Sequence, residues 1–176
     1  MNTSPAAEGA LLKDCLIEVD DWKSESGLIA RIEVALDTAQ DYVKSIEGLS
    51  FTPDCEISLV FSDDETVRTL NAEHRGKDKA TNVLSFPIDE DADLFGPMLG
   101  DIVFAYQTVK REAEELGVEI SAHMTHLSVH GFLHLLGYDH IEADEADKME
   151  SVEIAILARL GLPNPYADTV PISSLD

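Results

Sequence analysis

The chain has 176 residues, 44% of them hydrophobic, which favours one domain with a full core. A formal net charge of −23 excludes a nucleic-acid binder held by a globally basic surface. Neither a signal peptide nor a run of ~20 apolar residues is visible, so we expect a soluble cytoplasmic protein with no membrane partner. Cys15 and Cys55 are isolated in apolar stretches, which predicts buried reduced thiols.

The first half of the chain alternates strand and helix patterns. Residues 1–11 are expected to be a flexible N-terminus. Residues 12–19 predict a first strand, and residues 55–61, which alternate and are rich in β-branched side chains, predict a second. Between them, residues 27–46 place apolar side chains at helical spacing, and Gly48 ends this predicted helix.

A capped helix follows the second strand. Ser62 is the expected N-cap of a helix that runs to about residue 73. Glu65 stands three residues after Ser62, which completes a capping box.

A local basic loop comes next in this acidic chain. Three of the 12 Lys and Arg residues fall within five positions: Arg75, Lys77 and Lys79. The charge pattern favours a solvated turn, with a patch that faces phosphate groups as the alternative.

Short elements then lead to the most informative part of the chain. They are, in order, a third strand (81–86), an acidic loop (89–93), a fourth strand (100–105) and a helix (108–116). Pro87 is expected to stop the third strand because proline lacks the N–H of a sheet ladder. Gly117 closes the helix.

A helix predicted over residues 121–136 carries regularly spaced histidines. His130 and His134 are four residues apart, so they share one helix face and can converge on one ion. Gly137 allows a left-handed turn that returns His140 to a third coordination position. A helical histidine pair alone is as consistent with an ordinary core or surface pair, but the glycine and the third histidine favour a metal. Three imidazoles suit Zn²⁺, and three ligands leave the open position of a catalytic site.

The spacing matches the long zincin signature H-E-x-x-H-x-x-G-x-x-H except at one position. Where a metalloprotease carries its general-base glutamate, this chain has Gly131, so the site is zincin-like without protease chemistry. His123 and His126 lie upstream on nearly the same stripe. They are interpreted either as partners that orient a ligand or as a plain polar helix face.

The last helix is predicted over residues 142–160, before Gly161 and Pro163. Residues 164–176 are expected to be a poorly ordered tail, which leaves a single metal-binding domain over residues 12–163. The order of elements predicts an α+β fold, an α/β sandwich. In it a small mixed four-stranded sheet packs with helices around a central metal-binding helix.

The run HGFLHLLGYDH at residues 130–140 resembles the signature of the YbeY family, bacterial endoribonucleases of ribosomal RNA maturation. Two other segments are similar to blocks of that family: NAEHRGKDKATNVLSFP at 71–87 and LGDI at 99–102. The similarity spans about residues 12–166. It implies a motif helix beside a four-stranded sheet and one zinc ion per chain, held by His130, His134 and His140.

The resemblance also implies a function. It implies cleavage of single-stranded RNA at the 3′ end of small-subunit ribosomal RNA, a role in ribosome quality control, and the ribosome or ribosomal proteins as partners. Arg75 matches the family's functional arginine, whose planar guanidinium suits phosphate oxygens. Lys77 and Lys79 are expected to bind the same substrate. No residue stands out as the general base. Asp139 and Glu142 lie close to the third ligand, but they are as consistent with orienting a histidine or capping a helix as with that role.

Other interpretations remain open from the sequence. Zinc chemistry allows attack by water or by the 2′-hydroxyl of RNA. A metalloprotease is favoured by the histidine spacing and disfavoured by Gly131. A non-enzymatic ribosome assembly factor, in which zinc only stabilises the fold, is disfavoured by the open fourth coordination position.

Overall fold

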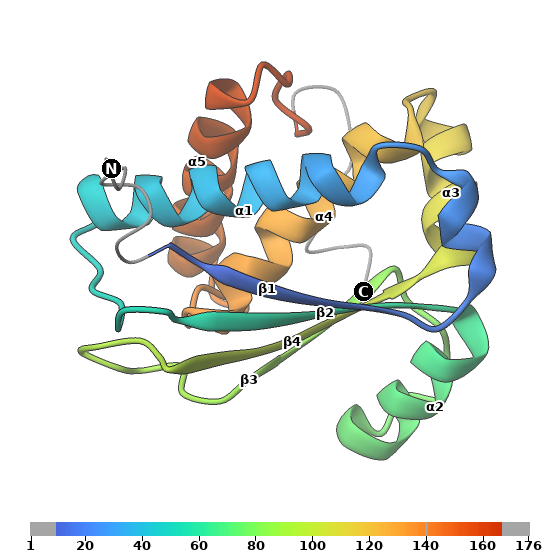
Figure 1. Cartoon of the computed structure of the whole chain (residues 1–176), viewed down its shortest axis with the longest axis horizontal. Helices are drawn as coiled ribbons and strands as arrows, with labels where there is room; N and C mark the ends of the chain where they lie inside the picture. Colours follow the sequence, from blue (N-terminus) through green and yellow to red (C-terminus); the bar gives the residue numbers. More distant parts are fainter. Residues whose placement is uncertain (1–9, 140, 167–176) are drawn as a thin grey trace, which may run out of the picture.

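The computed structural model describes residues 10–139 and 141–166 and centres on a four-stranded mixed sheet (Figure 1). The strands lie in the order β1-β2-β4-β3. The β1–β2 and β2–β4 pairs are parallel, and β3 runs antiparallel to β4 at one edge. The predicted mixed sheet is therefore confirmed. The strands are β1 (Leu12–Ile17), β2 (Glu56–Ser62), β3 (Val83–Pro87) and β4 (Met98–Ala105).

Helices cover both faces of this sheet. Figure 1 shows α1, α4 and α5 on one face, α2 on the opposite face and α3 at the end of the sheet. The α-helices are α1 (Leu28–Ser45), α2 (Asp64–Arg75), α3 (Tyr106–Leu116), α4 (Ile120–Leu135) and α5 (Ala143–Arg159).

The helix α4 is enclosed on nearly every side. It contacts α1, α3, α5 and the strands β3 and β4. The side chains of Leu127, Phe132 and Leu133 are all 0% exposed, and His130 is 4% exposed. A helix that is apolar almost all round has to be buried. Because α4 lies inside the fold, each polar side chain on it needs a partner.

The opposite face of the sheet has a smaller core. Val67 of α2 packs against Leu84 of β3 and Val103 of β4, and all three are buried. Pro87 is the last residue of the edge strand β3 and pairs with Gly100. The strand ends at this proline, as expected. The edge strand β3 thus lies between α2 on one face and α4 on the other.

Two local predictions near β2 are wrong or incomplete. The N-cap of α2 is Asp63, whose side chain accepts a hydrogen bond from the backbone N of Thr66, so Ser62 and Glu65 form no capping box. Ser62 instead stays in the sheet, paired with Ala105, because β2 runs one residue further than expected. The first strand ends at Ile17, and a short 3-10 helix (Asp20–Ser24) that was not predicted follows it.

Both cysteines are free thiols, as predicted. Cys55 is buried and Cys15 is half-buried, and burial raises the pKa of both thiols. In the described part of the chain, no helix is both long and apolar enough to cross a membrane.

Candidate metal centre

Two of the three predicted ligands meet at the end of α4. The Nε2 atoms of His130 and His134 lie 3.0 Å apart, with ring centroids separated by 4.5 Å. Two imidazole nitrogens bound to a tetrahedral zinc at about 2.0–2.1 Å are separated by about 3.3 Å. The observed spacing therefore fits two ligands of one ion. His140 lies outside the described residues, and the described residues alone contain no cluster of three metal-binding side chains.

The turn after α4 leads from the histidine pair towards position 140. Gly137 has a φ of +93°, as expected for a left-handed turn. A Cβ atom at Gly137 would also lie 2.2 Å from the carbonyl oxygen of Glu90, in the loop between β3 and β4. The next residue, Tyr138, donates a hydrogen bond from its hydroxyl to Glu47 Oε1 at 3.0 Å. The turn is therefore held from two sides, and Gly137 is required by its φ and by this close approach.

The position of the missing glutamate faces the sheet. A Cβ atom on Gly131 would lie 3.1 Å from Ser85 Oγ and 3.1 Å from two side-chain carbons of Ile102. Ser85 also donates a hydrogen bond to the carbonyl oxygen of Gly131 at 3.3 Å. A side chain at this position would require Ile102 and Ser85 to shift by a few tenths of an ångström. The protease general base is absent from the sequence, and the packing of α4 on β3 and β4 disfavours one here.

A buried carboxylate lies behind the histidine pair. Glu153 of α5 is 0% exposed, and its Oε1 lies 2.8 Å from Nδ1 of His130. Its Oε2 lies 3.0 Å from Nε2 of His126 and accepts a hydrogen bond from the Tyr166 hydroxyl at 2.6 Å. Burial alone would raise the pKa of Glu153, but hydrogen bonds from His126 and His130 lower it to about 2. The carboxylate is therefore ionised at neutral pH.

The first histidine of the stripe has a different carboxylate partner. His123 is 5% exposed, and its Nε2 lies 2.8 Å from Glu112 Oε1 of α3. The same oxygen accepts a hydrogen bond from Asn82 Nδ2 at 2.9 Å. His123 and His126 are therefore partnered inside the fold, which rules out a plain polar helix face. Of the two, His126 shares a carboxylate with a predicted ligand.

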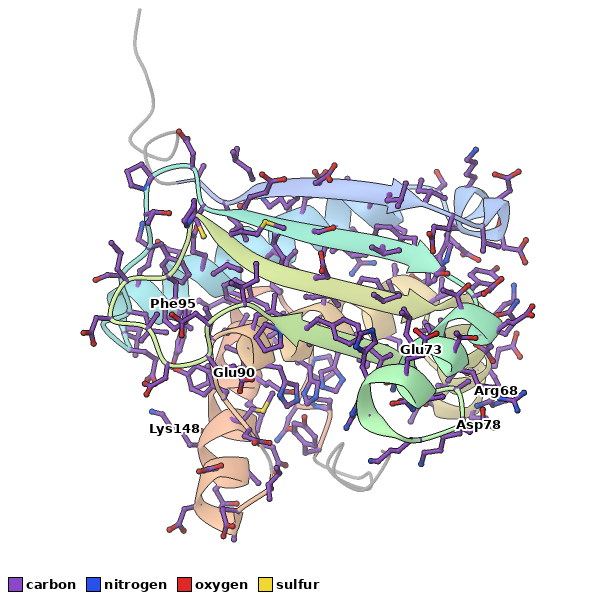
Figure 2. The ribbon with its side chains drawn as sticks, turned by 90° about the horizontal axis from the view of Figure 1, so that it is seen from below. Arg68, Glu73, Asp78, Glu90, Phe95 and Lys148 are labelled. Carbon is purple, nitrogen blue, oxygen red and sulfur yellow. The ribbon has the colours of Figure 1, made fainter. Side chains whose placement is uncertain are left out.

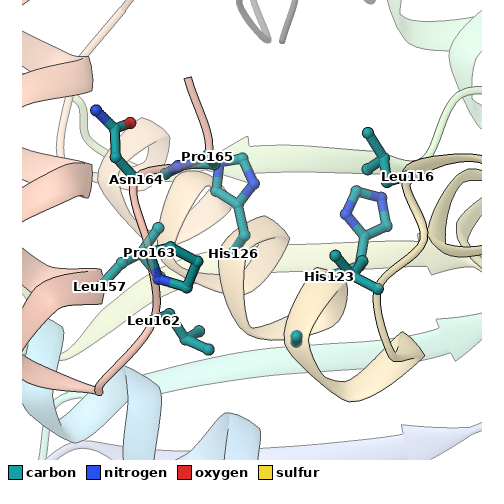
Figure 3. Close-up of a pocket in the computed structure, with 10 residues that line it drawn as sticks. Leu116, His123, His126, Leu157, Leu162, Pro163, Asn164 and Pro165 are labelled. Carbon is teal, nitrogen blue, oxygen red and sulfur yellow. The ribbon is translucent and has the colours of Figure 1, made fainter. Parts of the chain in front are cut away.

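A cavity of about 370 Å³ lies beside this part of α4 (Figure 3). The rings of His123 and His126 line it together with the apolar side chains of Leu157 and Pro163. Imidazoles of the α4 stripe thus border both the cavity and the buried carboxylate.

Arg75 is the last residue of α2, so this helix runs two residues further than expected, and α2 also holds the basic loop in place. Asn71, which is buried, donates from Nδ2 to the carbonyl oxygen of Lys79 at 2.9 Å. Arg68 forms two hydrogen bonds with the carboxylate of Asp78, at 2.8 and 3.2 Å, and Figure 2 shows these side chains next to each other. Asp78 is thereby neutralised within the loop. The three cations of this region are exposed, and within the described residues they form no ion pair: Arg75, Lys77 and Lys79.

One edge strand relates the basic loop to the histidine pair. The ring of His74, next to Arg75, packs edge-on against Phe86 of β3, with centroids 5.2 Å apart. Ser85, the preceding residue of β3, contacts Gly131 beside His130 on the other face. Neighbouring residues in a strand point to opposite faces. The structure therefore brings the loop and α4 to the same strand, on opposite faces of the sheet.

Sequence reasoning missed Glu153 and Tyr166. Nearness to His140 in the sequence pointed to Asp139 and Glu142, but the carboxylate at His130 comes from the middle of α5. The sequence did carry a signal, because Glu153 interrupts the apolar stripe of α5 formed by Met149, Val152 and Ile156. Tyr166 was placed in the poorly ordered tail, yet its hydroxyl reaches Glu153.

The chain is similar to known proteins over most of its length. A family model described as Endoribonuclease YbeY matches residues 20–161. Proteins named Endoribonuclease YbeY from Rhizobium meliloti and Rhodopseudomonas palustris are 52% and 48% identical; each match covers 88% of this chain, and 94% and 80% of the relatives. A Thermotoga maritima solution structure has a TM-score of 0.50 at 22% identity, covers 91% of this chain and 98% of its own, and supports the fold. The family match includes β2, β3, β4, the basic loop and α4, and this chain belongs to the Endoribonuclease YbeY family.

Proposed function

We propose that this protein is a zinc-dependent endoribonuclease that cleaves single-stranded RNA. The observation that carries the proposal is the convergence of His130 and His134 at 3.0 Å on a buried helix, in a chain whose relatives are named endoribonucleases. One zinc ion per chain would be held by these two side chains and by His140. The zincin-like spacing then belongs to a nuclease, because Gly131 stands where a metalloprotease carries its general-base glutamate.

The chemistry that zinc supplies at such a site is Lewis-acid activation of a phosphodiester or of a water molecule. The protein's own residues bind and orient the substrate. Arg75 offers a planar set of donors to phosphate oxygens, which neutralises charge that develops at phosphorus. Lys77 and Lys79 hold the neighbouring RNA backbone. Attack by water and attack by the 2′-hydroxyl are both compatible with this arrangement.

The biological substrate we propose is the 3′ end of small-subunit ribosomal RNA, in ribosome maturation and quality control in the cytoplasm. A net charge of −23 repels free RNA, so the basic loop provides only local contact. The ribosome or ribosomal proteins would then present the single-stranded substrate. This explains how a strongly acidic protein acts on a polyanion.

The test is an RNA cleavage assay with purified protein. The substrate is a single-stranded RNA that spans the 3′ end of small-subunit ribosomal RNA, with and without a chelator. The variants are His134→Ala, which removes one converging nitrogen, and Arg75→Ala and Arg75→Lys, which separate charge from planar geometry. Lys44→Ala is the matched control, since Lys44 is an exposed cation in the last turn of α1.

We expect cleavage that chelation, His134→Ala and Arg75→Ala each abolish, with Arg75→Lys impaired and Lys44→Ala active. Cleavage that survives all three treatments would come from a contaminating ribonuclease and would contradict the proposal. A folded protein that binds zinc but cleaves neither free RNA nor RNA on the ribosome would instead support a non-enzymatic assembly factor.

A further inference from the structure

Burial of the Glu153 carboxylate is unfavourable for stability, and packing contacts alone do not offset it. It is 0% exposed and lies on the helix face that buries Met149, Val152 and Ile156. A buried ion is expensive unless all its hydrogen-bonding capacity is used, and an apolar side chain of similar volume is often as stable. The reason for a carboxylate at this position therefore lies in what it contacts.

Glu153 joins three separate parts of the fold. Its Oε1 lies 2.8 Å from Nδ1 of His130 on α4. Its Oε2 lies 3.0 Å from Nε2 of His126 and 2.6 Å from the hydroxyl of Tyr166. An ionised carboxylate has only acceptors, so it can accept hydrogen bonds from all three groups at once. Both oxygens are thus used.

The contact with His130 determines which of its nitrogens faces the histidine pair. A neutral imidazole carries its proton on one nitrogen and binds a metal through the other. Donation from Nδ1 to Glu153 leaves the lone pair on Nε2, and Nε2 is the atom that lies 3.0 Å from Nε2 of His134. The carboxylate therefore stands on the far side of the ring from the converging nitrogens.

We propose that Glu153 is a positioning residue for the metal centre, which fixes the tautomer and the ring orientation of His130 so that Nε2 is presented to zinc. Such outer partners of ligand histidines raise metal affinity by keeping the ligand pre-oriented. The inference rests on the proposed zinc site and adds to it the residues behind the ligands.

The other oxygen of Glu153 keeps the carboxylate in place. His126 and Tyr166 both contact Oε2, so rotation of the carboxylate away from His130 would break two more hydrogen bonds. Tyr166 stands after the predicted domain end at residue 163. The segment that follows α5 is therefore part of the support for the site.

The first measurement is zinc affinity, by competition with a chromophoric chelator. The variants are Glu153→Met, which keeps the length and removes the acceptors, and Glu153→Gln, which keeps one acceptor oxygen. Glu145→Gln is the matched control, because Glu145 is an exposed carboxylate on the same helix. We expect Glu153→Met to weaken zinc binding by about 10- to 100-fold, Glu153→Gln to weaken it less, and Glu145→Gln to have no effect.

The second measurement is nitrogen-15 NMR of the imidazole rings in zinc-free protein. We expect His130 to be the Nδ1–H tautomer in the wild type and a mixture of tautomers in Glu153→Met, with the exposed His74 unchanged as an internal reference. A residue that only packed the core would lower the unfolding temperature without changing the tautomer or the zinc affinity. If the methionine variant does not fold, the same two readouts on Glu153→Gln decide.

Unchanged zinc affinity together with an unchanged His130 tautomer in a folded variant would overturn the inference while leaving the nuclease proposal intact. Failure of the wild-type protein to bind zinc at all would contradict the proposed zinc site and this inference with it. Weaker binding with a mixed tautomer would establish the positioning role.

Discussion

The carboxylate partners of the histidines on α4 come from two other helices. Glu112 of α3 contacts His123, and Glu153 of α5 contacts His126 and His130. Burial lowers the pKa of His126, although its hydrogen bond to Glu153 opposes this. A neutral imidazole is the form in which histidine binds a metal. Burial of His126 thus favours its neutral form.

Zinc binding at the histidine pair should stabilise the folded protein. A ligand that binds only the folded state at 100 times its dissociation constant raises the free energy of unfolding by about 2.7 kcal/mol. We expect zinc to raise the unfolding temperature of the wild-type protein, and His134→Ala to lose most of this increase. Differential scanning calorimetry with and without zinc measures it. The exposed His74→Ala is the control, and an equal zinc effect in both variants would contradict the assignment.

Gly137 should be intolerant of any side chain. Its φ of +93° is unfavourable for other residues, and a Cβ atom would lie 2.2 Å from the carbonyl oxygen of Glu90. Gly161, after α5, also has a positive φ of +79° but nothing within 4 Å of its Cβ position. We expect Gly161→Ala to cost about 1 kcal/mol of unfolding free energy and Gly137→Ala at least about 2 kcal/mol. Urea denaturation compares the two, and equal losses would show that Glu90 moves aside.

At the scale of elements, α2 and α3 cap each other across the sheet end. The N-cap of α3, Ala105, has no capping side chain. Asp64 of α2 replaces it, with its carboxylate accepting from the backbone N and from Oγ1 of Thr108, both at 2.9 Å. In return, Gln107 Oε1 accepts from the backbone N of Asp64 at 2.8 Å. One backbone N–H at the start of each helix is therefore satisfied by a side chain of the other helix, in addition to the Asp63 cap of α2.

This reciprocal cap should be measurable. Loss of an N-cap side chain typically costs about 1–2 kcal/mol, so we expect Asp64→Ala to lower the free energy of unfolding by about that amount. Asp144→Ala, in the first turn of α5, should change it by less than about 0.5 kcal/mol. Combining Asp64→Ala with Thr108→Val should cost less than the sum of the two single changes, because both remove the hydrogen bond from Thr108 Oγ1 to Asp64. Additive losses in urea denaturation would exclude the coupling.

The sequence predicted helices and strands well where the spacing of side chains and the positions of glycines agree. Glycines at 48, 117 and 161 lie just after α1, α3 and α5, and the histidine spacing placed His130 and His134 on one face. The errors occur where long-range contacts decide. Ser62 could not be recognised as part of β2, because its strand partner Ala105 lies 43 positions away. The 3-10 helix depends on Trp22, whose Nε1 donates to the carbonyl oxygen of Ser62 at 2.8 Å.

At the scale of the molecule, the candidate site combines segments that are far apart in the chain. The three predicted ligands come from one short motif, and two of them, His130 and His134, lie together in the structure. The carboxylate behind His130 comes from α5, and the basic loop meets α4 only across β3. Such contacts depend on the strand order β1-β2-β4-β3, which periodicity does not encode. The proximity of His130 and His134 was therefore predictable from the sequence, and the residues that contact them from other elements were not.

The negative net charge of the protein opposes RNA binding, whereas the basic loop favours it. The salt dependence of RNA affinity distinguishes the two contributions. For single-stranded nucleic acid, log affinity falls with log salt by about 0.7 per phosphate contact, so three contacts give a slope of about −2. We expect the slope to approach zero when the basic loop is neutralised by three changes to alanine, at Arg75, Lys77 and Lys79. The control neutralises three exposed cations elsewhere, at Lys23, Lys44 and Arg111. Both variants change the formal net charge from −23 to −26, since each loses three positive charges.

Fluorescence anisotropy with a single-stranded RNA at several salt concentrations measures the slopes. If position matters, only the loop variant loses its slope, whereas equal changes in both variants would mean that RNA responds to net charge and that the loop is an ordinary solvated turn.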